Sequence, residues 1–324
     1  MIDDTDTPFT QADALSRRLR HALAFAADVG ARALREFDHN FRGGHQEGGG
    51  HGQRGAGALI TPVETKHDGS VVTRVDRESE GALRELIRSA YPGDAILGEE
   101  LGAHEPDGWA AALGTSAQHE AFRWILDPID GTRSFVHGVP FWGVMITVER
   151  VRTAEQARTP GTGEFAGAVI AFPALGEVMA AGRGLGCWWK ATGGELCASR
   201  PWTRCGTAAR ERLADATLVM TSFKSLIELM GERRFLTLTS RSHVTRGWSD
   251  CYGNMLVATG RVDVMIDPPM ALWDWAPLVA IIEEAGGSVT DFRGGPPRKG
   301  DGVIACANPR LLEEILGIVD PTRS

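Results

Sequence analysis

This sequence of 324 residues has few cysteines, no excess of positive charge and no long apolar run. The five cysteines are an odd number at irregular spacing, and no Cys-x-x-Cys pair occurs, which argues against a zinc ribbon and against a disulfide framework. We therefore expect reduced thiols and a cytoplasmic protein. The cysteines are Cys187, Cys197, Cys205, Cys251 and Cys306.

Membrane and nucleic-acid partners are not expected either. No apolar run approaches the ~18 residues of a membrane-spanning helix, and residues 1–10 are polar and acidic, unlike a secretory signal. The formal net charge of −8 provides no basic surface for duplex nucleic acid or an anionic membrane. The negative net charge does not exclude a small anionic metabolite as a partner, because bound metal ions can reverse the local electrostatic field.

The sequence mixes helical and strand patterns, which predicts an α/β (α+β) layered architecture. Two segments, 42–57 and 152–165, are rich in glycine or polar residues and are predicted loop insertions, the second a hairpin connection. Helices are predicted at 10–37 with Thr10 as N-cap, at 76–90, and at 274–285 closed by Gly286-Gly287. Strands are predicted at 70–75, 95–97, 122–126, 142–150, 167–172, 178–182, 217–220 and 262–266.

Acidic residues follow predicted strands or begin a helix at three places. Glu99-Glu100 follows the strand at 95–97, Asp127 and Asp130 follow the strand at 122–126, and Asp274 begins the last predicted helix. Carboxylates at strand ends sit on short, rigid attachments where layered folds commonly bind ligands. Singly, each has a structural explanation: a solvated turn for Glu99-Glu100, or a helix N-cap for Asp274. Together they favour a metal site.

The segment from Asp127 to Thr132 has further features of such a site. Pro128 fixes one φ angle between the two aspartates. The carbonyl of Ile129 offers another oxygen, and a set of hard oxygen ligands suits Mg²⁺ better than Zn²⁺. Gly131-Thr132 then permits close approach of a phosphate to backbone N–H groups. Two metals roughly 3.5–4 Å apart could activate a water against that phosphate.

These motifs resemble those of the inositol monophosphatase family over about residues 12–316. The resemblance rests on Asp127-Pro128-Ile129-Asp130-Gly131-Thr132, on Gly98-Glu99-Glu100, and on Trp273-Asp274 followed by Glu283 and Ala285-Gly286-Gly287. It implies a single catalytic domain over 1–324, an αβαβα sandwich of the sugar-phosphatase type and a homodimer. The N-terminal half, about 10–150, would carry the metal motifs, and the C-terminal half, about 166–318, would complete the site.

The resemblance also implies residue roles. Two or three Mg²⁺ ions would be held by Glu99, Asp127, the Ile129 carbonyl, Asp130 and Asp274, with phosphate at Gly131 and Thr132. The segment from Lys66 to Asp76 resembles a further family motif, in which Asp76 pairs with Thr132. A carboxylate that accepts the threonine proton orients the hydroxyl toward the attacking water, and Glu99 would act on the same water as a general base.

The variable segments bear on the substrate. Residues 132–136 and Trp142-Gly143 resemble the branch of the family that hydrolyses histidinol phosphate. Asp250 stands where inositol-preferring members carry small residues, and Asp267 matches a position facing the leaving group. Two carboxylates would suit the ammonium and imidazole of histidinol phosphate. The structural alternative is that Asp250 only begins a helix and Asp267 only ends a strand.

The leading hypothesis is therefore a Mg²⁺-dependent histidinol-phosphate phosphatase. The nearest alternative is an inositol-1-phosphate or other polyol-phosphate phosphatase with the same metal site. A third is a phosphatase acting on the 3′-phosphate of an adenosine bisphosphate, for which we expect more basic residues near the motifs. A different class of protein, a non-catalytic scaffold that binds metal or phosphate, is disfavoured because all the matched ligands are intact.

Overall fold

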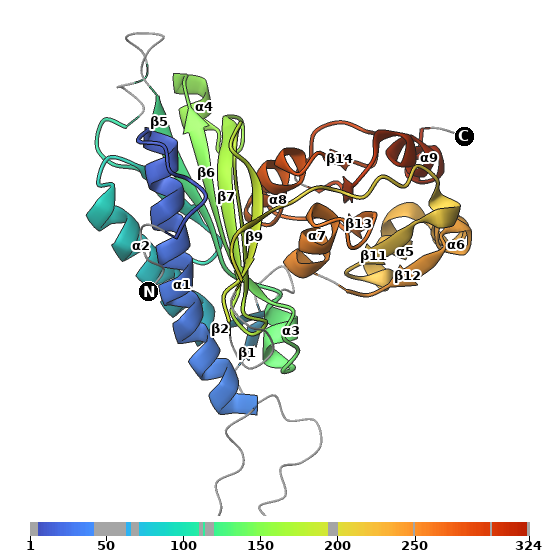
Figure 1. The fold of residues 1–324 in the computed structure, drawn as a ribbon, viewed down its shortest axis with the longest axis horizontal. Helices are drawn as coiled ribbons and strands as arrows, with labels where there is room; N and C mark the ends of the chain where they lie inside the picture. The colour runs from blue at the N-terminus through green and yellow to red at the C-terminus, as the bar shows by residue number, and fades with distance from the viewer. Residues whose placement is uncertain are drawn as a thin grey trace, which may run out of the picture.

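The computed structural model describes residues 6–41, 63–65, 71–109, 113, 120–193, 200–248, 250–298 and 300–322. The predicted insertion at 42–57 lies outside these residues. Two large sheets alternate with layers of helices in the order αβαβα, as the resemblance implies (Figure 1). Among the described residues, none of the helices combines the length and apolar character required to cross a membrane.

The first half is built on an eight-stranded sheet with the order β10-β9-β8-β7-β6-β5-β3-β4. Neighbouring strands of this sheet pair antiparallel, except that β3 and β5 run parallel with Gly98 opposite Leu126. This parallel pair brings Glu99, directly after β3, alongside Asp127 of β5. The strands are β3 (Ala95–Gly98), β4 (Gly102–His104), β5 (Ala121–Asp130), β6 (Gly143–Val151), β7 (Glu164–Phe172), β8 (Glu177–Gly182), β9 (Gly186–Ala191) and β10 (Thr203–Arg204).

The second half is built on a five-stranded sheet with the order β12-β11-β13-β15-β14. Strands β12, β11 and β13 are parallel, and β13, β15 and β14 pair antiparallel. These strands are β11 (Thr217–Met220), β12 (Val244–Arg246), β13 (Val264–Asp267), β14 (Ser288–Asp291) and β15 (Val303–Cys306). A separate two-stranded ladder joins β1 (Val63–Thr65) and β2 (Val71–Thr73).

Three helical layers bury the faces of the two sheets. The first, α1 (Ala14–Phe41) and α2 (Arg74–Ala90), packs on the large sheet through one apolar core. The second, α7 (Asp250–Ala258) and α8 (Leu272–Glu284), fills the space between the two sheets. The third covers the outer face of the small sheet and comprises α5 (Phe223–Met230), α6 (Glu232–Arg241) and α9 (Pro309–Val319). Short helices α3 (Thr132–Val136), α4 (Ala154–Arg158) and η2 (Leu213–Asp215) complete the described elements.

The start of the first helix, and the boundary between the strand predicted at 70–75 and the helix predicted at 76–90, need correction. Helix α1 begins at Ala14, and its cap is Asp13, whose Oδ1 accepts the N–H groups of Leu15 and Ser16 at 2.9 Å; Thr10 is not the cap. The strand predicted at 70–75 ends at Thr73, since Thr73 and Asp76 form a capping box that starts α2 at Arg74.

The segment 152–165 does connect two antiparallel neighbours, β6 and β7, as predicted. It is not all loop, because a capping box between Thr153 and Gln156 starts the helix α4, and β7 begins at Glu164. The predicted end of the helix at 274–285 is confirmed, with Gly286 at a φ of 98°.

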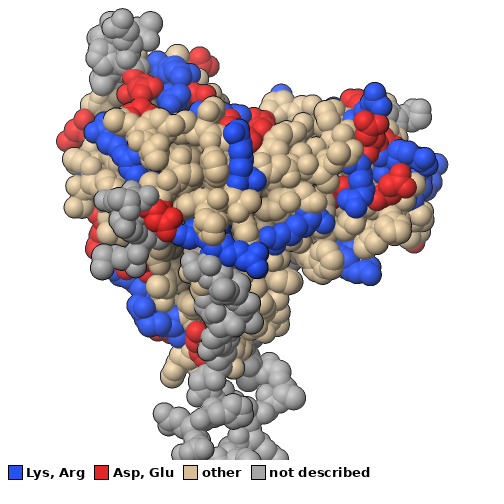
Figure 2. Space-filling view, in the orientation of Figure 1, with Lys and Arg blue, Asp and Glu red and all other residues tan. Residues whose placement is uncertain are grey.

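The space-filling view shows acidic and basic side chains intermixed on one face of both halves (Figure 2).

Candidate active site

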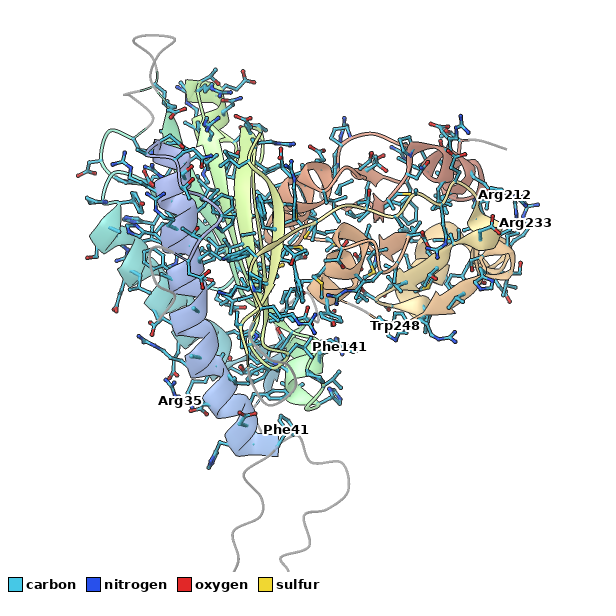
Figure 3. The ribbon with its side chains drawn as sticks, in the orientation of Figure 1. Arg35, Phe41, Phe141, Arg212, Arg233 and Trp248 are labelled. Carbon is cyan, nitrogen blue, oxygen red and sulfur yellow. The ribbon has the colours of Figure 1, made fainter. Side chains whose placement is uncertain are left out.

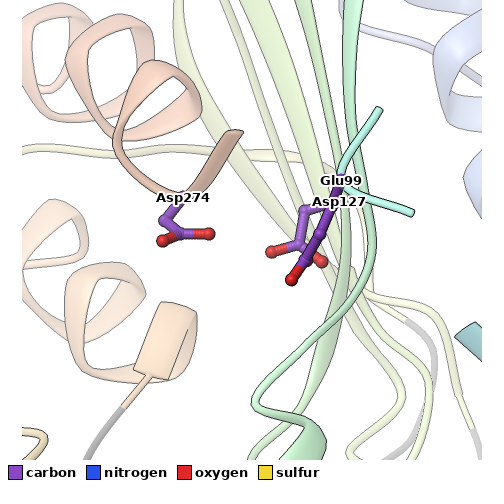
Figure 4. A group of neighbouring side chains, drawn as sticks. All are labelled: Glu99, Asp127 and Asp274. Carbon is purple, nitrogen blue, oxygen red and sulfur yellow. The ribbon is translucent and has the colours of Figure 1, made fainter. Parts of the chain in front are cut away.

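Three carboxylates meet where the two halves of the molecule face each other. Glu99 lies in the turn after β3, Asp127 lies in β5, and Asp274 lies in the first turn of α8. A ligand oxygen from each lies within 4.8 Å of the others. Figure 4 shows Asp274 reaching from the start of its helix toward the other two side chains. The structure therefore brings together acidic residues from all three places that the sequence analysis singled out.

Backbone hydrogen bonds explain these positions. The N–H of Glu99 donates to the carbonyl of Leu126 at 3.2 Å, which continues the parallel pairing of β3 with β5. Between Asp127 and Asp130 the pairing of β5 with β6 shifts register, and the N–H of Ile129 donates to Asp127 Oδ1 at 3.2 Å. Asp274 Oδ2 accepts the N–H of Ala271 at 2.8 Å, so this residue also caps its helix.

The electrostatics of the three carboxylates fit a divalent cation. Burial, followed by repulsion from Glu99, raises the pKa of Asp127 well above its ordinary value. The same two causes raise the pKa of Asp274 to about 7. Bringing three carboxylates this close is costly unless protons or a cation neutralise them. The donors are all carboxylate oxygens, which are the ligands that Mg²⁺ prefers.

Two further predicted ligands line the same pocket but stand outside the group of three. Asp130 Oδ2 accepts the N–H of Cys251 at 2.6 Å, which ties the end of β5 to α7. Burial, then the charges of Asp250 and Asp274, raises the pKa of Asp130 well above its ordinary value. The carbonyl of Ile129 faces the hydroxyl of Thr132 at 3.1 Å.

The expected contact between Asp76 and Thr132 is present. The Thr132 hydroxyl lies 3.1 Å from Asp76 Oδ1, within donating distance. Asp76 Oδ2 accepts the N–H of Thr73 at 2.9 Å and also the Thr73 hydroxyl. Burial raises the pKa of Asp76, and the hydrogen bonds from Thr73 and Thr132 oppose that rise. The capping box of α2 therefore holds this carboxylate in one place.

Gly131 occupies a position that other residues would fit poorly. Its φ is 80°, and a Cβ added to it would lie 2.8 Å from the carbonyl oxygen of Phe141. The ring of Phe141, labelled in Figure 3, stacks on that of Tyr252 with centroids 5.0 Å apart. The turn that leads into α3 is thus packed closely against the segment before β6.

The two residues predicted to contact the substrate also lie on the pocket wall. Asp250 begins α7 with a φ of 56° and accepts the hydroxyl of Ser134 at 2.9 Å. Asp267 ends β13 and accepts the hydroxyl of Thr221, while the Asn254 side-chain amide donates to it at 3.5 Å. Burial raises the pKa of Asp267 to about 7. Asp250 does begin a helix and Asp267 does end a strand, as the structural alternatives state, and both side chains also line the pocket.

Sequence reasoning assigned no role to several residues that complete the pocket. Pro268-Pro269 directly after Asp267 was an available signal for a rigid loop at the end of a strand. No local pattern marks Thr221, which reaches the site only because β11 lies beside β13. The residues added to the pocket by the structure are Arg133, Thr221, Pro268, Pro269 and Met270.

Comparison with known proteins shows the family of this chain. The model of the inositol monophosphatase family matches residues 15–322. The chain belongs to the inositol monophosphatase family. Among relatives of this family member, a histidinol-phosphatase of Chlorobaculum parvum is 38% identical over 247 residues, 76% of this chain and 82% of the relative.

Two other family relatives cover almost the whole chain. A histidinol-phosphatase of Streptomyces coelicolor is 34% identical over 307 residues, 94% of this chain and 96% of the relative. The solved structure of an inositol monophosphatase from Zymomonas mobilis has a TM-score of 0.68 at 25% identity. It covers 95% of this chain and 99% of its own. The fold and the family are therefore established over both halves of the molecule.

Proposed function

We propose that this family member is a Mg²⁺-dependent phosphomonoesterase that hydrolyses L-histidinol phosphate to L-histidinol and inorganic phosphate. The observation that carries the reaction class is the group of Glu99, Asp127 and Asp274, within 4.8 Å of one another. Gly131 and Thr132 line the same pocket and are the proposed phosphate contacts. Relatives named histidinol-phosphatase, one aligned with 94% of the chain, support the substrate.

The proposed metal ligands are the three carboxylates together with Asp130 and the Ile129 carbonyl, which would hold two or three ions. Their oxygens form the hard donor set of Mg²⁺, and burial and mutual repulsion, which raise the pKa values of Asp127 and Asp274, favour neutralisation by a cation there. When bound, Mg²⁺ would neutralise phosphoryl charge and lower the pKa of the attacking water. The homodimer and the cytoplasmic location stay predictions from the sequence.

The residues around the cluster would orient the reacting water. Because Asp76 accepts the proton of the Thr132 hydroxyl, the lone pairs of that oxygen can accept a hydrogen bond from water. Glu99 is the proposed base that holds the same water and takes its proton. As the water oxygen bonds to phosphorus, the bond from phosphorus to the substrate oxygen breaks; the leaving oxygen takes a proton from solvent, and Glu99 returns the proton of the attacking water to solvent.

The substrate preference is proposed to arise from Asp250 and Asp267. Both come from the second half of the molecule and line the pocket, and the Asp250 carboxylate lies beside Gly131, 3.1 Å from the place of a Cβ added there. Histidinol phosphate brings an ammonium and an imidazole, and a cation beside Asp267 would favour its ionised form over the protonated one. Inositol phosphate brings only hydroxyl groups beyond its phosphate and gains less from two carboxylates.

The test compares phosphate release from L-histidinol phosphate, inositol-1-phosphate and an adenosine bisphosphate, with purified protein in Mg²⁺. We expect kcat/KM for histidinol phosphate to be at least ~100-fold higher, or about 2.7 kcal/mol of discrimination. Asp127→Asn, the matched inactive control, should lower that rate by orders of magnitude. A preference for inositol phosphate would assign the polyol alternative, and no release by folded protein would favour a non-catalytic scaffold.

A further inference from the structure

A buried ion pair lies directly behind the turn that carries Glu99. Glu80 and Arg84 stand one helical turn apart on α2, with side chains 0% and 4% exposed. Arg84 Nε donates to Glu80 Oε1 at 2.7 Å. Burying two charges is expensive unless each finds further hydrogen bonds, so the other partners of this pair are informative.

Those partners are backbone groups of the turn between β3 and β4. Glu80 Oε2 accepts the N–H of Glu100 at 2.6 Å, and Oε1 accepts the N–H of Leu101 at 3.1 Å. Arg84 donates to the carbonyl of Gly102. The carboxylate also lies so close to Gly98 that a Cβ there would overlap it. Glu80 and Arg84 therefore hold the turn on both sides of Glu99, and neither of them lines the pocket.

We propose that Glu80, held by Arg84, is a positioning residue that sets the affinity of the carboxylate cluster for a divalent cation. The N–H of Glu99 donates to Leu126 of β5, and the next two N–H groups of the turn donate to Glu80. Losing Glu80 as acceptor leaves these two donors unsatisfied in a part-buried turn and frees the turn to rotate Glu99 away from Asp127 and Asp274. The inference rests on the proposed function, because Glu99 is taken as a metal ligand.

The chain contains a matched pair that separates positioning from stability. Glu149 and Arg123 are also buried, at 0% and 2%, with Arg123 Nη1 2.7 Å from Glu149 Oε2. Glu149 Oε1 likewise accepts two backbone N–H groups, of Gly161 at 3.0 Å and Gly163 at 2.7 Å. Arg123 precedes Asp127 by four residues of β5, or about 13 Å at strand rise. This second pair anchors the loop after β6, whose Gly161 lies against Leu272 of α8, and not the turn that carries Glu99.

The experiment compares Glu80→Gln with Glu149→Gln in the full chain. Each substitution keeps the side-chain shape but puts an NH₂ donor where an oxygen accepted hydrogen bonds. Binding of Mn²⁺, measured by electron paramagnetic resonance, is the main readout, and thermal unfolding measures stability. We expect similar losses of Tm in both variants, with Mn²⁺ affinity falling about 10- to 100-fold only in Glu80→Gln.

Three results would overturn the inference: Mn²⁺ affinity in Glu80→Gln within about twofold of wild type, equal weakening in both variants, or no Mn²⁺ binding by the wild type. If Glu80→Gln does not fold, Arg84→Lys is compared with Arg123→Lys, and only the former should weaken Mn²⁺ binding. Phosphate release is measured separately. Wild-type protein that binds Mn²⁺ but releases no phosphate would refute the proposed function and leave the positioning role standing.

Discussion

Replacing Asp250 by asparagine removes one negative charge from the pocket with little change of shape. Asparagine is the appropriate substitution because Asp250 has a φ of 56°, a left-handed conformation that asparagine adopts far more readily than alanine. The amide oxygen can still accept the Ser134 hydroxyl, which lies 2.9 Å from Oδ2. The fold of α7 and its contact with α3 are therefore expected to survive.

The magnitude follows from the type of interaction that is lost. A cation that loses a buried, hydrogen-bonded carboxylate partner loses about 2–5 kcal/mol. A hydroxyl that exchanges a charged acceptor for a neutral one loses about 1 kcal/mol. The difference is at least about 1 kcal/mol, so the preference for histidinol phosphate over inositol-1-phosphate should fall at least about fivefold.

The assay is kcat/KM for both substrates, with wild type and Asp250→Asn, at saturating Mg²⁺. Saturation is required because Asp250 is a charge that raises the pKa of Asp130, and its removal would also change metal affinity. Thermal unfolding provides the control for structure. Equal losses on the two substrates would refute the role of Asp250 in recognition, and a loss confined to inositol-1-phosphate would reverse the proposed substrate.

Two further predictions concern the turn at Gly131 and the acidity of the cluster. Gly131→Ala should lower phosphate release by at least ~100-fold, since a left-handed alanine costs roughly 1–2 kcal/mol and its Cβ would crowd the Phe141 carbonyl at 2.8 Å. Gly184→Ala is the control, because its φ is 74° but no atom lies within 4 Å of the added Cβ; equal effects on phosphate release would contradict the prediction. In metal-free protein, the pKa of Asp274 is raised from 3.8 to about 7, so the folded state holds more protons than the unfolded state between these values. That contribution to stability is complete below about pH 4 and is lost as the pH rises through 7. Tm in EDTA should therefore fall from pH 5 to pH 8, and Mg²⁺ should raise Tm most at pH 8; a Mg²⁺ effect independent of pH would contradict this.

The strand that carries the metal motif shows how far local patterns lead. The sequence predicts a strand at 122–126, because an aspartate and a proline follow it. In the structure β5 continues to Asp130, since the neighbouring β6 pairs across a register shift and accommodates Pro128. Whether two aspartates end a strand or continue it depends on a partner strand, which no local pattern specifies.

The second half of the chain was predicted less completely, for two different reasons. Helix α7 is buried almost all round, so its sequence lacks the apolar stripe that marks an amphipathic helix. Helix α9, by contrast, has a clear start signal, Asn308-Pro309, and a regular apolar face. Helix α9 is therefore marked by a local signal in the sequence, and α7 is not.

Residues that act on the site from behind are the hardest to find from sequence. Glu80 and Arg84 have the spacing of an ordinary solvent-exposed ion pair on a helix. Only the packing of α2 under the turn at residues 98–102 shows that both are buried and hold backbone groups beside Glu99. The proposed metal ligands are predictable because their chemistry is local, whereas the residues that position them depend on which helix lies beneath them.

The position of α8 connects the packing of the two halves with the chemistry of the cluster. This helix carries Asp274 in its first turn, and Ala276, Ala280 and Ile281 are buried in the core between the two sheets. That apolar layer holds Asp274 against Glu99 and Asp127, although burial and mutual repulsion raise the pKa values of both aspartates. Packing thus imposes a concentration of negative charge that the side chains alone would avoid. A divalent cation relieves this repulsion, so its binding should stabilise the contact between the halves as well as the cluster itself.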